Sequence, residues 1–301
     1  MGTPWLVLGY ISARNRRGIT FLDSIFKYPH HASMAKRKTI AQRNTPGSIV
    51  KPSELIDIDE MVPLQLVDRR IFNLLLANAW DQIDQDVEHC IRKRDLRGTT
   101  KDFKRLDDTI GRLQAARIKL LVKRDDNKKY RRSFGLLQRV DEGVAQNGLL
   151  YYKFDPDLRA VITESTVFAR LQKDILLQLS SKYSLCLYEM LQRRVNLTHK
   201  WSEEFTIEEI RKLLTVPKGK LTLYKNLKGY ALKPAVDEVN GLADFGVQME
   251  ELKKGRKVTG VRLAWYKKNQ DELKAAYEER SRHRAGRRAR LSGKAETPVL
   301  S

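Results

Sequence analysis

The sequence is poor in the residues that metal sites and disulfide frameworks need. It has two cysteines, Cys90 and Cys186, and five histidines in 301 residues. Both cysteines stand in apolar, helix-like patterns without a CxxC pair or a nearby pair of histidines. We therefore expect two buried, reduced thiols, with no disulfide and no metal site. No run of about 18 apolar residues occurs either, so we expect no membrane-spanning helix and no membrane partner.

The motifs of nucleotide hydrolysis and of DNA nicking are also missing. No G-x-x-x-x-G-K-[ST] loop occurs, because the stretch 216–222, VPKGKLT, lacks the leading glycine. The histidines are scattered, so no metal-binding cluster accompanies a tyrosine nucleophile. The acid pairs at 107–108 and 203–204 are adjacent on the chain, and adjacent residues on a helix do not converge. We expect a binding protein with no catalytic residues, no cofactor and no metal.

Acidic residues are few relative to basic ones. The chain has 37 aspartates and glutamates against 58 lysines and arginines, a formal net charge of +21. Such an excess indicates a polyanionic partner. Nucleic acid is the first candidate; an anionic membrane surface is the second, and we do not expect it to be the partner. The densest basic run, RSRHRAGRRARLSGK at 280–294, has almost no apolar residues, so we expect it to be disordered when free.

One stretch, Thr206–Trp265, has the order of a winged helix-turn-helix. Thr206 and Glu209 have the spacing of a capping box at a helix start. A second helical pattern follows, with an apolar stripe and an outward basic face, and after Ala243 the period changes to two, as in a β-hairpin. The basic turn Lys253–Lys257 forms the tip of that hairpin. Pro234 indicates either a bend in the second helix or a helix that begins near Lys233.

The N-terminal half repeats this order. An apolar stripe predicts a helix from Leu64 to Trp80, and a second helix is expected at 101–117, with a weaker one at 90–97. Strands are expected at 118–123, 134–140 and 149–154, the first two joined by a basic loop. A repeated order of elements implies two similar domains in tandem.

We therefore predict an α+β fold of two tandem winged helix-turn-helix domains. The expected division is a flexible N-terminal extension at 1–54, domains at 55–165 and 166–268, and a tail at 269–301 that is first helical and then disordered. Residues 1–33 do not match the rest, and Met34 resembles an ordinary start of a basic protein. We interpret 1–33 as an extension from an upstream start codon or as a flexible arm.

Four short segments occur in order, among them Ser181-Lys182-Tyr183, Leu187-Tyr188-Glu189 and Leu232-Lys233-Pro234-Ala235. Together they resemble the iteron-binding plasmid replication initiators of the Rep family, and the resemblance covers roughly 64–266. It implies a cytoplasmic bacterial protein whose C-terminal domain binds the direct repeats of a plasmid origin. The N-terminal domain would add backbone contacts and a dimer interface. Monomers would recruit the host initiator and helicase, and dimers would repress the initiator's own promoter.

We expect two sets of DNA contacts, with base contacts from Lys225, Asn226 and Lys228. In the C-terminal domain the expected contacts are Lys220, Tyr224, Lys225, Asn226, Lys228, Lys233, Lys253, Lys254, Arg256 and Lys257. In the N-terminal domain they are Lys101, Lys104, Arg105, Arg112, Lys128, Lys129, Arg131 and Arg132. Gly229 and Tyr230 depart from the family, which tends to carry basic residues there. The alternatives are a winged-helix transcription regulator without a replication role and a nicking or nucleotide-hydrolysing enzyme. The lysines could also be merely solvated.

Overall fold

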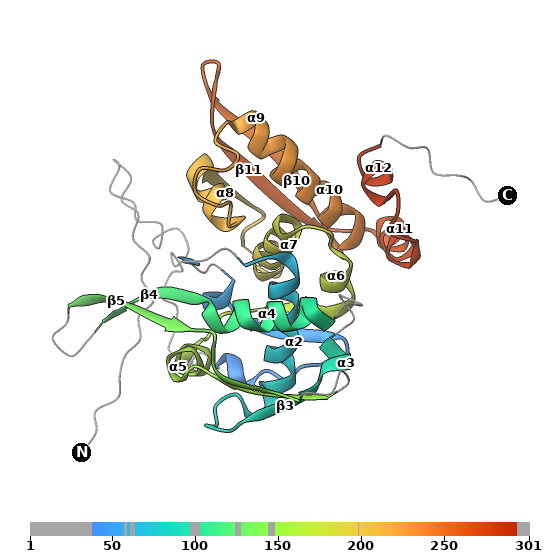
Figure 1. Cartoon of the computed structure of the whole chain (residues 1–301). Coiled ribbons are helices and arrows are strands. Elements are labelled where there is room, and N and C mark those ends of the chain that lie inside the picture. The colour runs from blue at the N-terminus through green and yellow to red at the C-terminus, as the bar shows by residue number, and fades with distance from the viewer. Residues whose placement is uncertain are drawn as a thin grey trace.

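The structure is a computed structural model that describes residues 38–56, 59–60, 64–96, 103–123, 128–143, 148–197 and 199–293. For 59–60, 103–105 and 120–123 it describes the backbone alone. Residues 1–37, and with them the predicted extension at 1–33, lie outside this part of the chain. Two winged-helix domains lie one above the other in Figure 1, with helix α7 (Lys182–Arg194) at their junction.

The N-terminal domain contains the predicted helices and wing. Its elements are β2 (Asp59–Glu60), α2 (Leu66–Ala79), β3 (His89–Arg92), α3 (Lys93–Leu96), α4 (Phe103–Ala115), β4 (Arg117–Lys123), β5 (Lys129–Gly135), β6 (Leu137–Glu142), β7 (Leu149–Phe154) and α5 (Pro156–Glu164). The sheets have the orders β2-β4-β5 and β3-β7-β6. The strand expected at 134–140 was wrong, because the chain breaks at Leu136 and its two halves pair in different sheets. The first three residues of the short helix expected at 90–97 belong to strand β3, which pairs with β7, and the helix α3 begins only at Lys93.

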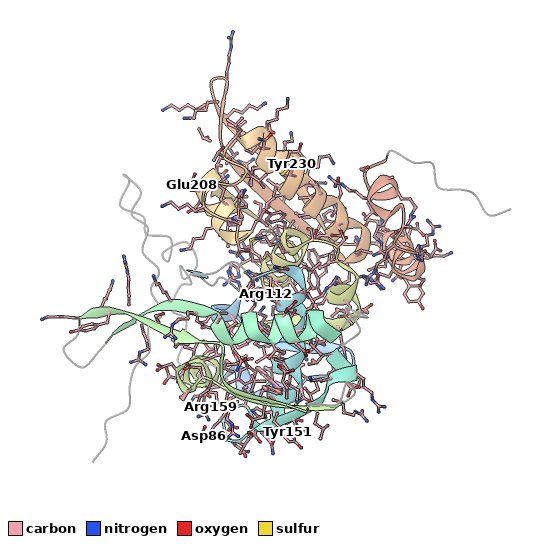
Figure 2. The ribbon with its side chains drawn as sticks, in the orientation of Figure 1. Asp86, Arg112, Tyr151, Arg159, Glu208 and Tyr230 are labelled. Carbon is pink, nitrogen blue, oxygen red and sulfur yellow. The ribbon has the colours of Figure 1, made fainter. Side chains whose placement is uncertain are left out.

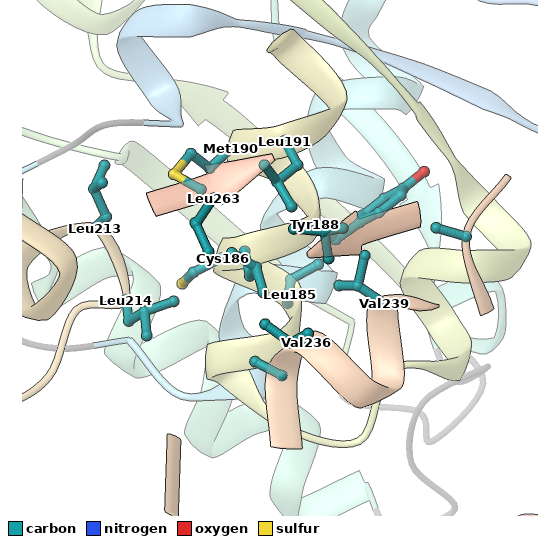
Figure 3. Packing of buried hydrophobic residues seen from close by; sticks show 14 of the residues in the cluster. Leu185, Cys186, Tyr188, Met190, Leu191, Leu213, Leu214, Val236, Val239 and Leu263 are labelled. Atoms are coloured by element: carbon teal, nitrogen blue, oxygen red, sulfur yellow. The ribbon is translucent and has the colours of Figure 1, made fainter. Parts of the chain in front are cut away.

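The C-terminal domain is built around α7. Its other elements are α6 (Lys173–Gln178), β9 (Ser202–Thr206), α8 (Ile207–Leu213), α9 (Tyr224–Leu227), the π-helical turn η5 (Lys228–Leu232), α10 (Lys233–Leu242), β10 (Phe245–Lys254) and β11 (Lys257–Lys267). Ser181 caps α7 by accepting a hydrogen bond from the Ser184 N–H. The helix is apolar on nearly all sides, so it is buried beneath α8, α10 and the sheet β10-β11-β9 (Figure 3). Tyr188 stacks on Phe245 with ring centroids 6.1 Å apart.

A two-stranded sheet of β1 (Ser48–Pro52) and β8 (Phe168–Gln172) lies between the two cores. Successive side chains of a strand point to opposite faces, so Ile49 packs into the C-terminal core and Val50 into the N-terminal one. The assignment of 48–54 to a flexible arm was therefore wrong. Two apolar residues between prolines and glycine are a weak local signal, and the strand is stabilised by residues more than a hundred positions away.

Lys51 on the same strand forms a buried ion pair with Glu189 of α7. Its ammonium lies 2.9 Å from a Glu189 carboxylate oxygen, and the two side chains are 2% and 0% exposed. Asn73 of α2 donates a third hydrogen bond to this carboxylate at 2.7 Å. The group therefore joins α2 of the N-terminal domain and α7 of the C-terminal domain to the strand between the two cores.

The basic tail is folded as far as residue 293, contrary to the expected disorder. Helices α11 (Gln270–Ser281) and α12 (Arg287–Leu291) pack on the end of α10 at one side of the C-terminal domain (Figure 1). Glu279 accepts hydrogen bonds from Arg287 at 3.1 Å and from Arg290 at 2.6 Å. Arg284 and Arg287 also donate to the carbonyl groups of Leu177 and Gln178 at the end of α6. Arginines that are paired in this way can be buried, which composition alone does not reveal.

The cysteines differ from each other. Cys186 is buried as expected, but Cys90 is exposed on strand β3, and both are free thiols. Strand β3 turns this position outward, which the assumed helix would not. Across the described residues, no helix is long and apolar enough to cross a membrane.

Candidate nucleic-acid interface

The helix-turn-helix of the C-terminal domain begins at the predicted capping box. Thr206 accepts a hydrogen bond from the Glu209 N–H at 3.2 Å, and the Glu209 carboxylate accepts one from the Thr206 N–H at 2.7 Å. Helix α8 therefore starts at a defined residue, and the strand before it, β9, belongs to the sheet. The capping-box prediction is confirmed.

The turn between α8 and α9 is held by a residue that the sequence analysis did not single out. Arg211 donates hydrogen bonds to the carbonyl groups of Lys220 and Leu221. Thr215 and Leu221 have φ values of 50° and 51°, a region that residues with a side chain seldom occupy. Lys182 of α7 supports the turn by donating to the Thr215 carbonyl at 3.0 Å. These bonds fix the direction in which the second helix leaves the turn.

The second helix runs without a break from Tyr224 to Leu242, but with one wide turn. The π-helical turn η5 lies between α9 and α10, and Leu232 and Lys233 keep helical backbone angles. Pro234 cannot donate to the carbonyl four residues back, that of Tyr230, and its ring needs space there. A wider turn supplies that space, so the helix bulges and does not begin at Lys233.

The expected base contact Lys228 is already bound within the protein. Its ammonium lies 2.7 Å from the Glu251 carboxylate on β10, and the Tyr224 hydroxyl donates to the same oxygen at 3.0 Å. The hydrogen bond from Lys228 holds the pKa of Glu251 below its usual value. Burial raises the pKa of Tyr224, and Glu251 raises it further, so the phenol remains a donor. Glu251 thereby ties the helix to the wing.

The outer face of this helix carries Lys225 and Lys233, both exposed. Lys233 pairs with Asp237 one turn later at 2.8 Å, and Asn226 is half-buried. Lys220 is exposed in the turn before the helix. Strands β10 and β11 carry the wing tip beyond the body of the domain (Figure 1), where Lys253, Lys254, Arg256 and Lys257 are all exposed around Gly255.

Two large side chains on this face were not among the expected contacts. Leu223 is 66% exposed and Tyr230 is 68% exposed, and Figure 2 marks Tyr230 on the outer side of the helix. The signal in the sequence was their place outside the buried stripe of Leu227, Ala231 and Ala235. Neither side chain is charged, so the positive charge that marks the other expected contacts does not mark these two.

The N-terminal contacts are less uniform. Arg112 of α4 turns inward and binds Asp68 of α2 through its Nη2 and Nε atoms, at 2.7 and 3.0 Å. Arg132 pairs with Asp157 at 2.6 Å, whereas Lys128, Lys129 and Arg131 are exposed at the wing of β4 and β5. Lys101 lies outside the described residues, and of Lys104 and Arg105 only the backbone is described.

Comparison with known proteins identifies both domains. The family model described as "Initiator Replication protein, WH1" matches residues 48–192, and "Initiator Rep protein, WH2" matches 206–265. Together they span more than half of the chain. No curated protein sequence matches it significantly.

One solved structure adds a likeness of fold. The crystal structure of the Pi initiator protein in complex with iteron DNA has a TM-score of 0.53 at 18% identity, covering 75% of this chain and 100% of that one. Domains 2 and 3 of RctB give a TM-score of 0.43 at 11% identity, covering 72% of this chain and 85% of theirs. With the helix-turn-helix, the wing and the tandem order described above, the chain belongs to the Rep family of replication initiator proteins, with a WH1 and a WH2 domain.

Proposed function

We propose that the protein is a plasmid replication initiator that binds direct repeats of the replication origin through its C-terminal winged helix. The observation that supports this most directly is the combination of an outward-facing helix with a cationic wing tip at one end of it. A helix of this kind enters the major groove, and lysines and arginines on a hairpin neutralise phosphates beside it. The Pi initiator of similar fold was crystallised with iteron DNA.

The division of contacts follows from which side chains are exposed at the surface. Lys253, Lys254, Arg256 and Lys257 at the C-terminal wing would contact phosphates, and Lys225 on the helix would reach base edges. Lys220, Asn226 and Lys233 would flank it. Lys228 and Tyr224 would position the helix against the wing through Glu251. The N-terminal wing, with Lys128, Lys129 and Arg131, would add contacts to the DNA backbone.

Footprinting of the purified protein on the DNA that flanks its own gene tests the proposal. Several direct repeats protected at the spacing of a helical turn are expected, because one monomer would cover each repeat. Protection of a single promoter palindrome would instead indicate a transcription regulator. A site-specific nick in supercoiled plasmid in the presence of a divalent metal would contradict the proposal that the protein has no catalytic activity.

The family membership supports three finer proposals. The protein would act in the bacterial cytoplasm on the origin as a monomer, and as a dimer it would repress its own promoter. At the origin it would recruit the host initiator and helicase. Sedimentation with and without origin and promoter duplexes measures the first two, and pull-down with purified host proteins measures the third.

A further inference from the structure

Gly229 lies on the outer face of the second helix of the C-terminal domain, and no contact among the described residues accounts for it. The residue is exposed, and a Cβ atom built on it would meet no atom of the described residues within 4 Å. Its φ is not in the left-handed region that favours glycine. Glycine within a helix is less favourable than alanine, because more backbone freedom is lost when it is ordered. The fold alone would therefore be more stable with alanine at this position.

Most other glycines of the C-terminal domain have a structural reason. A Cβ atom on Gly260 would lie 2.4 Å from the Phe205 carbonyl oxygen, and one on Gly241 would clash with Leu291. Gly255 at the wing tip has a φ of 61°. Gly111 on α4 is open and exposed like Gly229. An open glycine is thus no site by itself, but Gly111 provides a matched control.

The neighbour of Gly229 supplies the second observation. Tyr230 is 68% exposed, and in the described part of the chain its side chain has no hydrogen bond, ion pair or ring contact. Leu223 is exposed to a similar extent seven residues earlier, two turns along the helix. Leu223 and Tyr230 add exposed apolar surface to the same segment that carries the exposed Lys225 and Lys233. The wide turn η5 contains both Gly229 and Tyr230, and such turns are frequent at functional sites.

We propose that Gly229 and Tyr230 form the centre of the base-reading surface. Gly229 lets the DNA approach the helix backbone closely, and the ring of Tyr230 packs on the C5-methyl group of a thymine in the major groove. The inference rests on the proposed function and specifies the chemistry of its site. An uncharged ring cannot neutralise a phosphate, and the thymine methyl group is the one apolar feature of base edges in that groove. Lys228 is less suited to this role because Glu251 already binds it.

The variant Gly229→Ala separates a role in DNA binding from a role in folding. A binding role predicts weaker DNA binding with unchanged or higher thermal stability, whereas a folding role predicts lower thermal stability. Its midpoint of thermal unfolding should stay or rise, since alanine is the better helix former. Its affinity for a repeat duplex found by footprinting should fall about 5- to 150-fold, while its affinity for a scrambled duplex stays unchanged. Gly111→Ala should show the same thermal effect without any loss of affinity. A Gly229→Ala protein that binds the repeat like wild type would overturn the role of Gly229.

The contact of Tyr230 is tested by replacing thymines of the repeat with deoxyuridine, one position at a time. At one position the wild type should lose affinity about 5-fold or more, because deoxyuridine lacks the methyl group. Tyr230→Ala should bind the normal repeat as weakly as the wild type binds that substituted duplex, and should lose nothing further there. Tyr230→Phe should behave like wild type.

Two results would overturn the thymine contact. One is a wild-type protein that tolerates deoxyuridine at every position of the repeat. The other is a Tyr230→Ala protein that is as sensitive to the substitution as wild type. A wild-type protein that does not prefer the repeat over the scrambled duplex would overturn the proposed function itself. If the wild type prefers the repeat and the Gly229 and Tyr230 variants bind it equally well, only the present inference would be overturned.

Discussion

The two winged helices share one fold but use the outer face of the second helix differently. In the described part of α4 that face carries Asp107 and Asp108, and Arg112 is drawn inward to Asp68. On α9 and η5 it carries Lys225, Gly229 and Tyr230. Exposed carboxylates repel phosphates, whereas cationic and apolar groups suit a groove of DNA. The comparison indicates that positive charge in a sequence marks a DNA surface only where tertiary partners leave it exposed.

The wings are more alike than the helices. Each is a two-stranded ribbon with exposed basic residues beside its tip, Arg131 in the first domain and Lys254 in the second. The second wing is tied to its helix by Glu251, which binds Lys228 and Tyr224. These hydrogen bonds fix the position of the wing relative to the helix. A fixed position is needed if helix and wing are to contact the DNA in one register.

Separating the two winged helices at their junction should have the largest effect. Glu189→Ala leaves the Lys51 ammonium buried without a counter-charge, so the free energy of unfolding should fall by about 3–5 kcal/mol. Urea unfolding measures it. The double variant Lys51→Met with Glu189→Gln should recover most of the loss, because it removes both charges and keeps an acceptor for Asn73. A double variant as unstable as the single one would contradict the role of the ion pair.

The contrast between the two helices predicts opposite effects for two basic residues. Arg112→Ala leaves the Asp68 carboxylate, which is 0% exposed, without its partner. It should cost about 2–3 kcal/mol of stability, less than Glu189→Ala because Arg112 is itself 36% exposed. Lys225→Ala should leave stability unchanged and weaken binding of the repeat by about 1–3 kcal/mol. If Arg112→Ala unfolds like wild type but lowers the salt dependence of DNA binding, the assignment is wrong.

The folded tail, packed on α10 of the second winged helix, should respond to acid. Burial alone would raise the pKa of Glu279, but the hydrogen bonds from Arg290 and Arg287 outweigh it, and the pKa lies below its ordinary value of 4.5. The stabilisation is therefore complete above that value and is lost as the pH falls through the folded-state pKa. Glu279→Ala should cost the tail about 1–3 kcal/mol at neutral pH.

Hydrogen exchange of α11 and α12, corrected for the intrinsic rates, measures this effect. Protection of the amides of α11 and α12 should fall in acid for the wild type. In Glu279→Gln it should change less with pH, because this variant has no carboxylate at position 279. Equal acid sensitivity in both proteins would show that other carboxylates cause it.

The smallest effect is expected at the wings, where the two domains should behave alike. Lys254→Ala and Arg131→Ala would each remove one of the proposed phosphate contacts. Each should lower the slope of log affinity against log salt concentration by about one, equally on repeat and random DNA. Titration at several salt concentrations measures the slopes. An unchanged slope for Arg131→Ala alone would mean that the first wing does not touch DNA.

Much of the fold could be predicted because its signals are local. The capping box of Thr206 and Glu209, the apolar stripe before Leu242 and the alternation after Ala243 each depend on residues a few positions apart. The same holds for the repeated order in the first half. The basic wings could be predicted because a turn between two strands has no buried face, so its charged side chains are exposed.

The tertiary structure decided every feature that depends on a distant partner. Lys51 is a core residue because Glu189 neutralises it, Arg112 faces inward because Asp68 lies beneath it, and the tail folds because Glu279 pairs its arginines. From the sequence alone, a charged residue is expected to lie at the surface. The free-energy cost of burying its charge is offset only by a partner group that folding brings near. The sequence by itself therefore determined the order of helices, strands and wings. The packing of the two domains decided which charged side chains remain exposed. It also decided that Tyr230 is exposed among them.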